Sequence, residues 1–189
     1  MIVTSNKTLD AINDMLATIG EAPVNTLDNS ENVDVALALR VLDKVNKQVQ
    51  SQGWSFNTNT SATLSPDVQT NKIKWQDDIL YIVGTDGTKY VQKGDYVYDF
   101  DNQTATFTNP IDVELIRLVD FDYMPVPARD YIVAKASRIF NAQTLNDPDI
   151  AENVSIMERE AWAAFQEYEM ELNDFTMYDI QNVQQLKMR

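Results

Sequence analysis

Pairs of carboxylates are the residues in this sequence with the most obvious capacity for chemistry. Asp77 and Asp78 are adjacent, and Asp120 and Asp122 are separated by one residue. Two carboxylates placed on either side of a glycosidic bond can hydrolyse it, so the pairs are compatible with a carboxylate-dependent glycan hydrolase. Among 29 acidic residues in a chain of 189, such pairs also arise by chance. The pairs therefore do not by themselves predict an enzyme.

Two further motifs lack the spacing that their chemistry requires. Asp99 and Asp120 each begin a segment like a calcium loop. The sixth position of such a loop needs glycine for a sharp turn, but here it is Thr104 or Pro125. Residues 84–89 contain two glycines and a lysine without the spacing of a phosphate-binding loop, and a hairpin turn explains them better. We expect no metal, no cofactor and no catalytic residue.

The chain contains no cysteine and no histidine. Without cysteine there are no disulfides, no thiolate nucleophiles and no cysteine ligands for zinc or iron–sulfur clusters. Without histidine, Ser-His-Asp and Cys-His mechanisms and histidine metal ligands are excluded. Whole classes of enzymes are thus incompatible with the sequence.

The net charge is −14, which gives the chain as a whole no electrostatic attraction for nucleic acid. Residues 142–180 hold ten acids and one base, Arg159. This pattern is typical of a solvated helix face, and also of a wall to which DNA must not adhere. We find no stripe of aromatic and basic residues that predicts nucleic-acid binding. An acidic mimic of DNA is an alternative, although the ordered apolar pattern described below disfavours it.

No segment has the roughly 20 apolar residues needed to cross a bilayer. The first residues also lack the basic and apolar regions of a secretory signal. We therefore expect a protein that is soluble and cytoplasmic when it is made, without a membrane partner.

Residues 30–56 organise the rest of the chain, and they predict a long helix followed directly by a strand. Gly53 can end the helix, and Trp54 and Phe56 alternate with polar residues, as in a half-buried strand. Apolar residues at steps of three and four place one face of the helix in the core: Val35, Ala38, Leu39, Leu42, Val45 and Val49.

Leu37 and Val41 are four residues apart and lie away from that main stripe. One interpretation, which we favour, is that the apolar stripe is wide or that the helix is buried on two sides within the monomer. The other is that Leu37 and Val41 contact a second subunit.

The remaining pattern predicts an α+β fold: a helical bundle built from both chain ends with an inserted antiparallel β region. Residues 8–19 read as a helix, residues 54–123 as short strands in an antiparallel meander, and helices return after Pro125 and at Asp147-Pro148. We expect the bundle in residues 1–53 and 124–172, the β region in 54–123 and a C-terminal tail in 173–189. The last helix carries a seam at near-heptad steps: Ile150, Val154, Met157, Ala161, Phe165, Tyr168 and Leu172.

The tail loses this seam but keeps many large apolar residues, which predicts that it docks on a partner. These residues are Phe175, Met177, Tyr178, Ile180, Val183 and Leu186.

Long motifs in the same order resemble the tail tubular protein A family of short-tailed bacteriophages (podoviruses), the head-to-tail adaptor or gatekeeper. The resemblance covers residues 9 to 170 and rests on AINDMLATIGEAPV (11–24), NKQVQSQGWSFN (46–57), GDYVYD (94–99), IRLVDFDYMP (116–125), KASRIFN (135–141) and EYEM (167–170).

The resemblance implies a structural virion protein of the phage tail that is assembled in the host cytoplasm and is not an enzyme. It implies a dodecameric ring of this chain between the portal protein and the nozzle protein (tail tubular protein B), with tail fibres attached near that junction. The ring surrounds the channel of DNA ejection, through which DNA passes without specific binding. It implies a helical part on the portal side and a β part on the nozzle side. On this basis Leu37 and Val41 are hypothesised to contact the neighbouring subunit, and the apolar tail to bind the portal.

Overall fold

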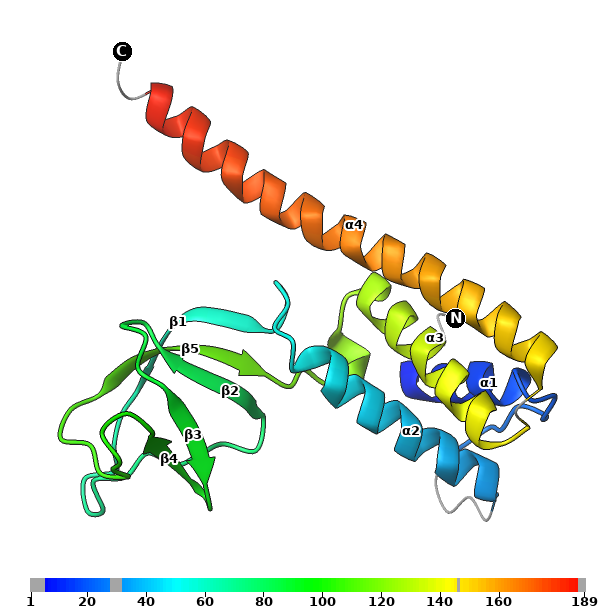
Figure 1. Ribbon diagram of the computed structural model, residues 1–189, viewed down its shortest axis with the longest axis horizontal. Helices are drawn as coiled ribbons and strands as arrows, with labels where there is room; N and C mark the ends of the chain where they lie inside the picture. The colour runs from blue at the N-terminus through cyan, green and yellow to red at the C-terminus, as the bar shows by residue number, and fades with distance from the viewer. Residues whose placement is uncertain (1–5, 28–31, 146, 187–189) are drawn as a thin grey trace. The chain divides into compact units, whose positions relative to one another are not determined.

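The computed structural model describes residues 6–27, 32–145 and 147–186, and for residues 173–186 it describes the backbone alone. The chain divides into two compact units, Met1–Asn46 with Asp120–Arg189, and Lys47–Val119. The first is helical and the second holds the strands, which confirms the α+β class (Figure 1). The boundaries at 46/47 and 119/120 lie a few residues before those expected from the sequence.

The helical unit is built from segments at both ends of the chain. Asn6 begins the first helix by accepting a hydrogen bond from Leu9 N at 3.1 Å. Asp147 begins the last helix by accepting one from Asp149 N at 2.9 Å, as its sequence predicts. The elements of the unit are α1 (Lys7–Ala17), most of α2 (Val33–Gln50), the 3-10 helix η1 (Phe121–Tyr123), α3 (Val126–Gln143) and α4 (Pro148–Leu186).

Helices α3 and α4 pack against each other in antiparallel directions. Near the end of α3, Arg138 forms an ion pair with Glu158, close to the start of α4. Two turns earlier in α3, the ring of Tyr131 lies 4.7 Å from that of Trp162 and 6.0 Å from that of Phe165. Phe165 is fully buried, as its place in the near-heptad seam predicts.

Helix α4 continues well past the residues that α3 contacts. The antiparallel register places the first residue of α3 level with about residue 170 of α4. The sequence predicted that the helical pattern would be lost after residue 172, but the backbone remains helical to Leu186. No glycine or proline follows Pro148, so no residue in this stretch interrupts the helix. The predicted tail is therefore a continuation of α4.

The β unit contains a three-stranded antiparallel sheet and a two-stranded hairpin. In the sheet the strand order is β1-β5-β2, so the first and last strands of the insertion are neighbours. The predicted meander, in which each strand pairs with the next, is therefore wrong except for the β3-β4 hairpin. The strands are β1 (Thr58–Leu64), β2 (Ile79–Gly84), β3 (Tyr90–Lys93), β4 (Tyr96–Asp99) and β5 (Ile111–Arg117).

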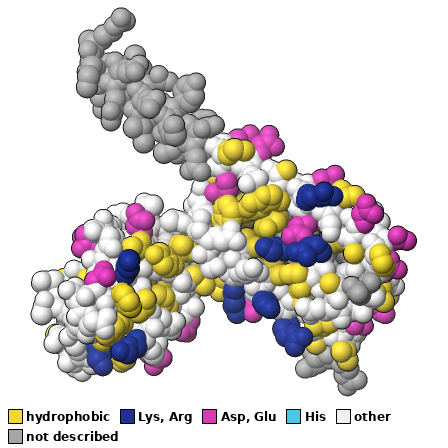
Figure 2. All heavy atoms as spheres, viewed as in Figure 1, with side chains coloured by type: hydrophobic (Ala, Val, Ile, Leu, Met, Phe, Trp, Pro, Cys, Tyr) yellow, Lys and Arg dark blue, Asp and Glu magenta, His cyan; other side chains and the backbone are white. Residues whose placement is uncertain are grey.

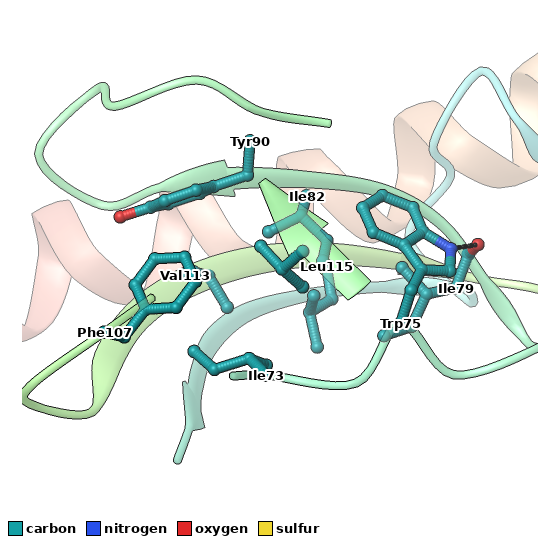
Figure 3. Packing of buried hydrophobic residues seen from close by; sticks show 9 residues of the cluster. Ile73, Trp75, Ile79, Ile82, Tyr90, Phe107, Val113 and Leu115 are labelled. Carbon is teal, nitrogen blue, oxygen red and sulfur yellow. Dashed lines mark hydrogen bonds between the residues drawn. The ribbon is translucent and has the colours of Figure 1, made fainter. Parts of the chain in front are cut away.

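An apolar core fills the β unit, to which the sheet, the hairpin and the segment before β2 all contribute (Figure 3). Trp75 lies at one end of this core, where its indole N–H donates to Ile79 O at 2.9 Å. Tyr90 and Phe107 lie at the other end, with ring centroids 6.2 Å apart. The buried members are Ile73, Trp75, Ile79, Ile82, Tyr90, Val97, Phe107, Val113 and Leu115.

Residues 54–57 form a turn instead of the predicted strand, and β1 begins only at Thr58. The carboxamide of Asn57 accepts a hydrogen bond from Trp54 N at 2.8 Å, which folds the backbone back on itself. The indole N–H of Trp54 donates to Val49 O at 2.7 Å and so satisfies a carbonyl near the end of α2. Local side-chain hydrogen bonds thus outweigh the alternating pattern.

The side chains of two buried amides connect the beginning and the end of the β unit. Gln50 donates to Val119 O at 2.8 Å and accepts from Val119 N at 2.7 Å. Asn57 donates to Gln50 O at 2.9 Å and to Arg117 O at 3.0 Å. Gln50 is fully buried and Asn57 nearly so, which means that water cannot replace these bonds.

Replacing Asn57 with alanine will destabilise the protein. The change removes the bonds to Gln50 O and Arg117 O, and each buried group left without a partner costs about 1–3 kcal/mol. Urea denaturation will show the loss as a lower midpoint. The control is Asn109→Ala, at an exposed position of the same unit where we expect a change within about 0.5 kcal/mol. Equal midpoints for the two variants would contradict the role of Asn57.

Candidate interaction surfaces

Three of the four acidic residues that suggested glycan hydrolysis, Asp78, Asp120 and Asp122, form structural hydrogen bonds or an ion pair. The Asp78 carboxylate lies 2.6 Å from the Arg117 guanidinium. Asp120 accepts from Asp122 N at 3.0 Å, and Asp122 accepts from the Thr8 backbone N–H and hydroxyl, both at 3.1 Å. The side chains of Asp120 and Asp122 therefore order η1 and attach α1 to it.

The first calcium-like segment is a tight turn after β4. Asp99 is buried and accepts from the backbone and side-chain nitrogens of Asn102, both at 2.8 Å. Asp101 accepts from Lys89 N at 3.0 Å. Among the described residues, no group of three or more acidic side chains is arranged to hold a metal ion.

An open groove of about 820 Å³ lies between α1, α3 and α4 of the helical unit. Small side chains form much of its lining, and they come from all three helices: Ala17, Ala134, Ala161 and Ala164. Met157 also lines the groove and is 56% exposed, although it belongs to the predicted core seam. A residue that the sequence pattern assigns to the core is therefore accessible to solvent in this groove. The groove could not be predicted from the sequence, because small residues at helical spacing also occur in a closed core.

Carboxylates give the groove a negative rim. Asp14 on α1, Asp130 on α3 and Glu160 on α4 line it. Partial burial raises the pKa of Asp14 above its usual value of 3.8, and repulsion from Asp10 and Asp130 raises it further. Partial burial also raises the pKa of Asp130, against the opposing effect of Arg129. Both carboxylates are therefore less stable as anions than they would be in water.

The two residues hypothesised to contact a neighbouring subunit differ in accessibility. Val41 is 4% exposed, so its side chain is already covered within its own chain. Leu37 is half-buried and presents part of its side chain. The burial of Val41 agrees with the favoured interpretation, a helix buried on two sides of the monomer. It also means that a charge at position 41 would disrupt the core, so only Leu37 is suited to a test of the interface.

The apolar residues predicted to bind a partner belong to the part of α4 beyond residue 172. The backbone places them on a continuous helix, but their side chains lie outside the described residues. No helix in the described part of the chain is long and apolar enough to cross a membrane.

Comparison with known proteins gives two matches. Residues 9–175 match the family described as "Tube: Tail tubular protein". The chain is also 27% identical over 124 residues to a protein of Klebsiella phage KP34 named tail tubular protein A. That alignment covers 66% of this chain and 66% of the relative, slightly less than two thirds of each.

Replacing Asp14 with asparagine will stabilise the protein slightly at pH 7. The folded-state pKa is raised, so the folded state binds more protons than the unfolded state as pH falls from above that pKa to about 3.8. The charge of Asp14 therefore destabilises the protein fully above the pKa that Asp14 has in the folded state. This destabilisation disappears below the pKa that Asp14 has in the unfolded state. We expect a gain of about 0.5 kcal/mol or less at pH 7 that vanishes near pH 3.5.

The measurement is thermal unfolding as a function of pH. The control, Glu167→Gln, removes a charge at an exposed position of the same unit outside the groove lining. A gain for Asp14→Asn that persists at low pH would contradict the electrostatic explanation.

Proposed function

The chain belongs to the tail tubular protein family, and we propose that it forms the adaptor ring that joins the portal to the tail nozzle. In this role the ring is a structural part of the virion tail and surrounds part of the DNA ejection channel. The observation that carries the proposal is the family match over residues 9–175, supported by the relative named tail tubular protein A. The proposed partners are the portal protein, the nozzle protein, the tail fibres and further copies of this chain in a dodecamer.

An adaptor requires separate surfaces for its separate partners, and the helical unit offers suitable ones. The groove between α1, α3 and α4 leaves Met157 and several alanines accessible. The part of α4 beyond residue 172 extends past the residues that α3 contacts. We assign the latter to the portal because a long helix with many apolar residues can insert into a partner.

The distribution of charge suits a channel through which DNA must slide. The helical unit holds 20 acids and 9 bases, and the β unit holds 9 acids and 6 bases. B-DNA carries about one negative charge per 1.7 Å of its axis, so an acidic wall repels it instead of binding it. Exposed carboxylates on α4, such as Glu152, Glu160 and Glu167, are candidates for such a wall.

The alternative, a carboxylate-dependent glycan hydrolase of the phage tail, gains no support from the acidic pairs. Asp78 is paired with Arg117, and Asp120 and Asp122 accept structural hydrogen bonds. Hydrolysis of capsular or peptidoglycan glycans by the purified protein would favour this alternative over the adaptor.

Replacing Leu37 with glutamate will prevent ring formation if Leu37 contacts a neighbouring subunit. The charge would be buried without a partner in the assembly while the monomer stays folded, because Leu37 is only half-buried. Mass photometry and negative-stain imaging with the portal protein of the same phage provide the measurement. Ala36→Glu, which adds the same charge at an exposed position of α2, is the control. Intact rings with Leu37→Glu would refute the assignment.

Deleting residues 173–189 will reduce binding to the portal protein by at least about tenfold if the end of α4 inserts into it, because the apolar contacts are lost. A second variant keeps the full length and replaces Ile180, Val183 and Leu186 with serine. Its control replaces Gln181, Gln184 and Gln185 in the same segment with alanine. Circular dichroism will verify that each variant is folded. Unchanged portal binding by the deletion would exclude this role for the tail.

A further inference from the structure

The β3-β4 hairpin carries a row of aromatic side chains on its outward side. Tyr96 pairs with Lys93 and Tyr98 pairs with Val91, so these four residues lie on one face. Val97 and Tyr90 are buried on the opposite face, in the core of the β unit. The aromatic row therefore faces away from the core.

Phe100 follows directly after β4 and extends this row. Its backbone N–H donates to Lys89 O at 2.9 Å, which continues the register of the hairpin by one pair. The side chain of Phe100 is 53% exposed and that of Tyr96 is 36% exposed. Two large apolar side chains of the row are thus accessible.

A third segment adds two lysines on the other side of β4. Lys74 forms an isolated bridge with Tyr96, and Val97 N donates to Ile73 O at 2.9 Å. Ile73 is buried in the core, so its neighbours Lys72 and Lys74 point to the side of Tyr96. We call the resulting surface the hairpin face: Lys72, Lys74, Lys93, Tyr96, Tyr98 and Phe100. Figure 2 shows hydrophobic side chains flanked by basic ones over β3 and β4.

Two of the lysines are held against the rings. The ammonium of Lys72 lies 4.8 Å from the ring centroid of Tyr96, and that of Lys93 lies 4.1 Å from the ring centroid of Tyr98. These cation–π contacts order the long side chains before a partner arrives and so lower the entropic cost of binding.

The hairpin face is positive within an acidic protein. Within the described residues, its three lysines form no ion pair with a carboxylate. Asp95 and Asp101 are exposed near the two ends of β4, and Asp101 accepts from Lys89 N. The positive charge is therefore concentrated at the centre of the hairpin face, with an acidic residue near each end.

We propose that the hairpin face binds a second tail protein through carboxylates that this partner presents among apolar side chains. Aromatic residues are enriched at protein interfaces, and the lysines supply charge complementarity. A polynucleotide is a poorer ligand because it carries a charge on every nucleotide, and the chain around this small positive face has a net charge of −14. The inference rests on the proposed adaptor role, in which the end of α4 is assigned to the portal and another surface must bind the next tail protein.

The test compares the binding of the wild type and three variants to the portal and nozzle proteins of the same phage by biolayer interferometry. The double variant Lys72→Glu/Lys93→Glu reverses two charges of the face. The control Arg40→Glu/Lys44→Glu makes the same charge change at exposed positions of α2. Phe100→Ala removes apolar area without a change of charge. Thermal unfolding verifies that all three are folded.

We expect the charge reversal to weaken nozzle binding at least tenfold while portal binding stays within twofold. Phe100→Ala should weaken nozzle binding about fivefold, and the control should change neither. Added salt should weaken wild-type nozzle binding, because the lysines act through charge.

Equal nozzle binding by the wild type and the charge-reversal variant would refute the proposed role of the hairpin face and leave the adaptor role intact. Failure of the wild type to bind either protein would instead refute the adaptor role and this inference together. Two other outcomes would identify a different occupant and also overturn the inference. In the first, the charge reversal abolishes rings and leaves nozzle binding unchanged. In the second, the protein binds a single-stranded thymidine oligonucleotide more tightly than the nozzle protein.

Discussion

The buried amides of Gln50 and Asn57 are the interaction on which the arrangement of the β unit depends. Together they satisfy four backbone groups, at Gln50, Arg117 and Val119, where water has no access. These groups belong to the segments by which the chain enters and leaves the unit. If these bonds broke, the buried backbone groups would have no other hydrogen-bond partner. The two segments must therefore lie side by side. That constraint explains why β1 pairs with β5, the most distant strand in sequence.

The two units differ in the chemistry of their accessible surfaces. The helical unit has an excess of acids and a groove lined by alanines and Met157, whereas the β unit presents lysines and aromatic rings on the hairpin face. Apolar grooves favour complementary shape, and charged aromatic faces favour complementary charge. Two surfaces of such different chemistry would favour two different kinds of protein partner, which suits the proposed adaptor.

The sequence predicted those elements whose signals are local. The start of α4 at Asp147-Pro148 and helix α1 follow from neighbouring residues, and the structure confirms them. The turn at residues 54–57 was missed because Asn57 bonds to the backbone three residues away and outweighs the alternation of Trp54 and Phe56. The hairpin face was missed because Lys72 and Tyr96 are 24 positions apart in sequence and meet only through strand pairing. Non-local pairing leaves no periodic trace in a single sequence.

Burial on α2 and α4 shows why apolar periodicity alone does not identify an interface. Val41 lies outside the main stripe of its helix and is nevertheless covered, whereas Met157 lies within the seam of its helix and is accessible. A helix between several neighbours buries more than one face, and a long helix outruns the neighbours that cover it. Surfaces available to partners are therefore found where packing ends. Among the described side chains, such places include the groove beside α4 and the outer side of the hairpin.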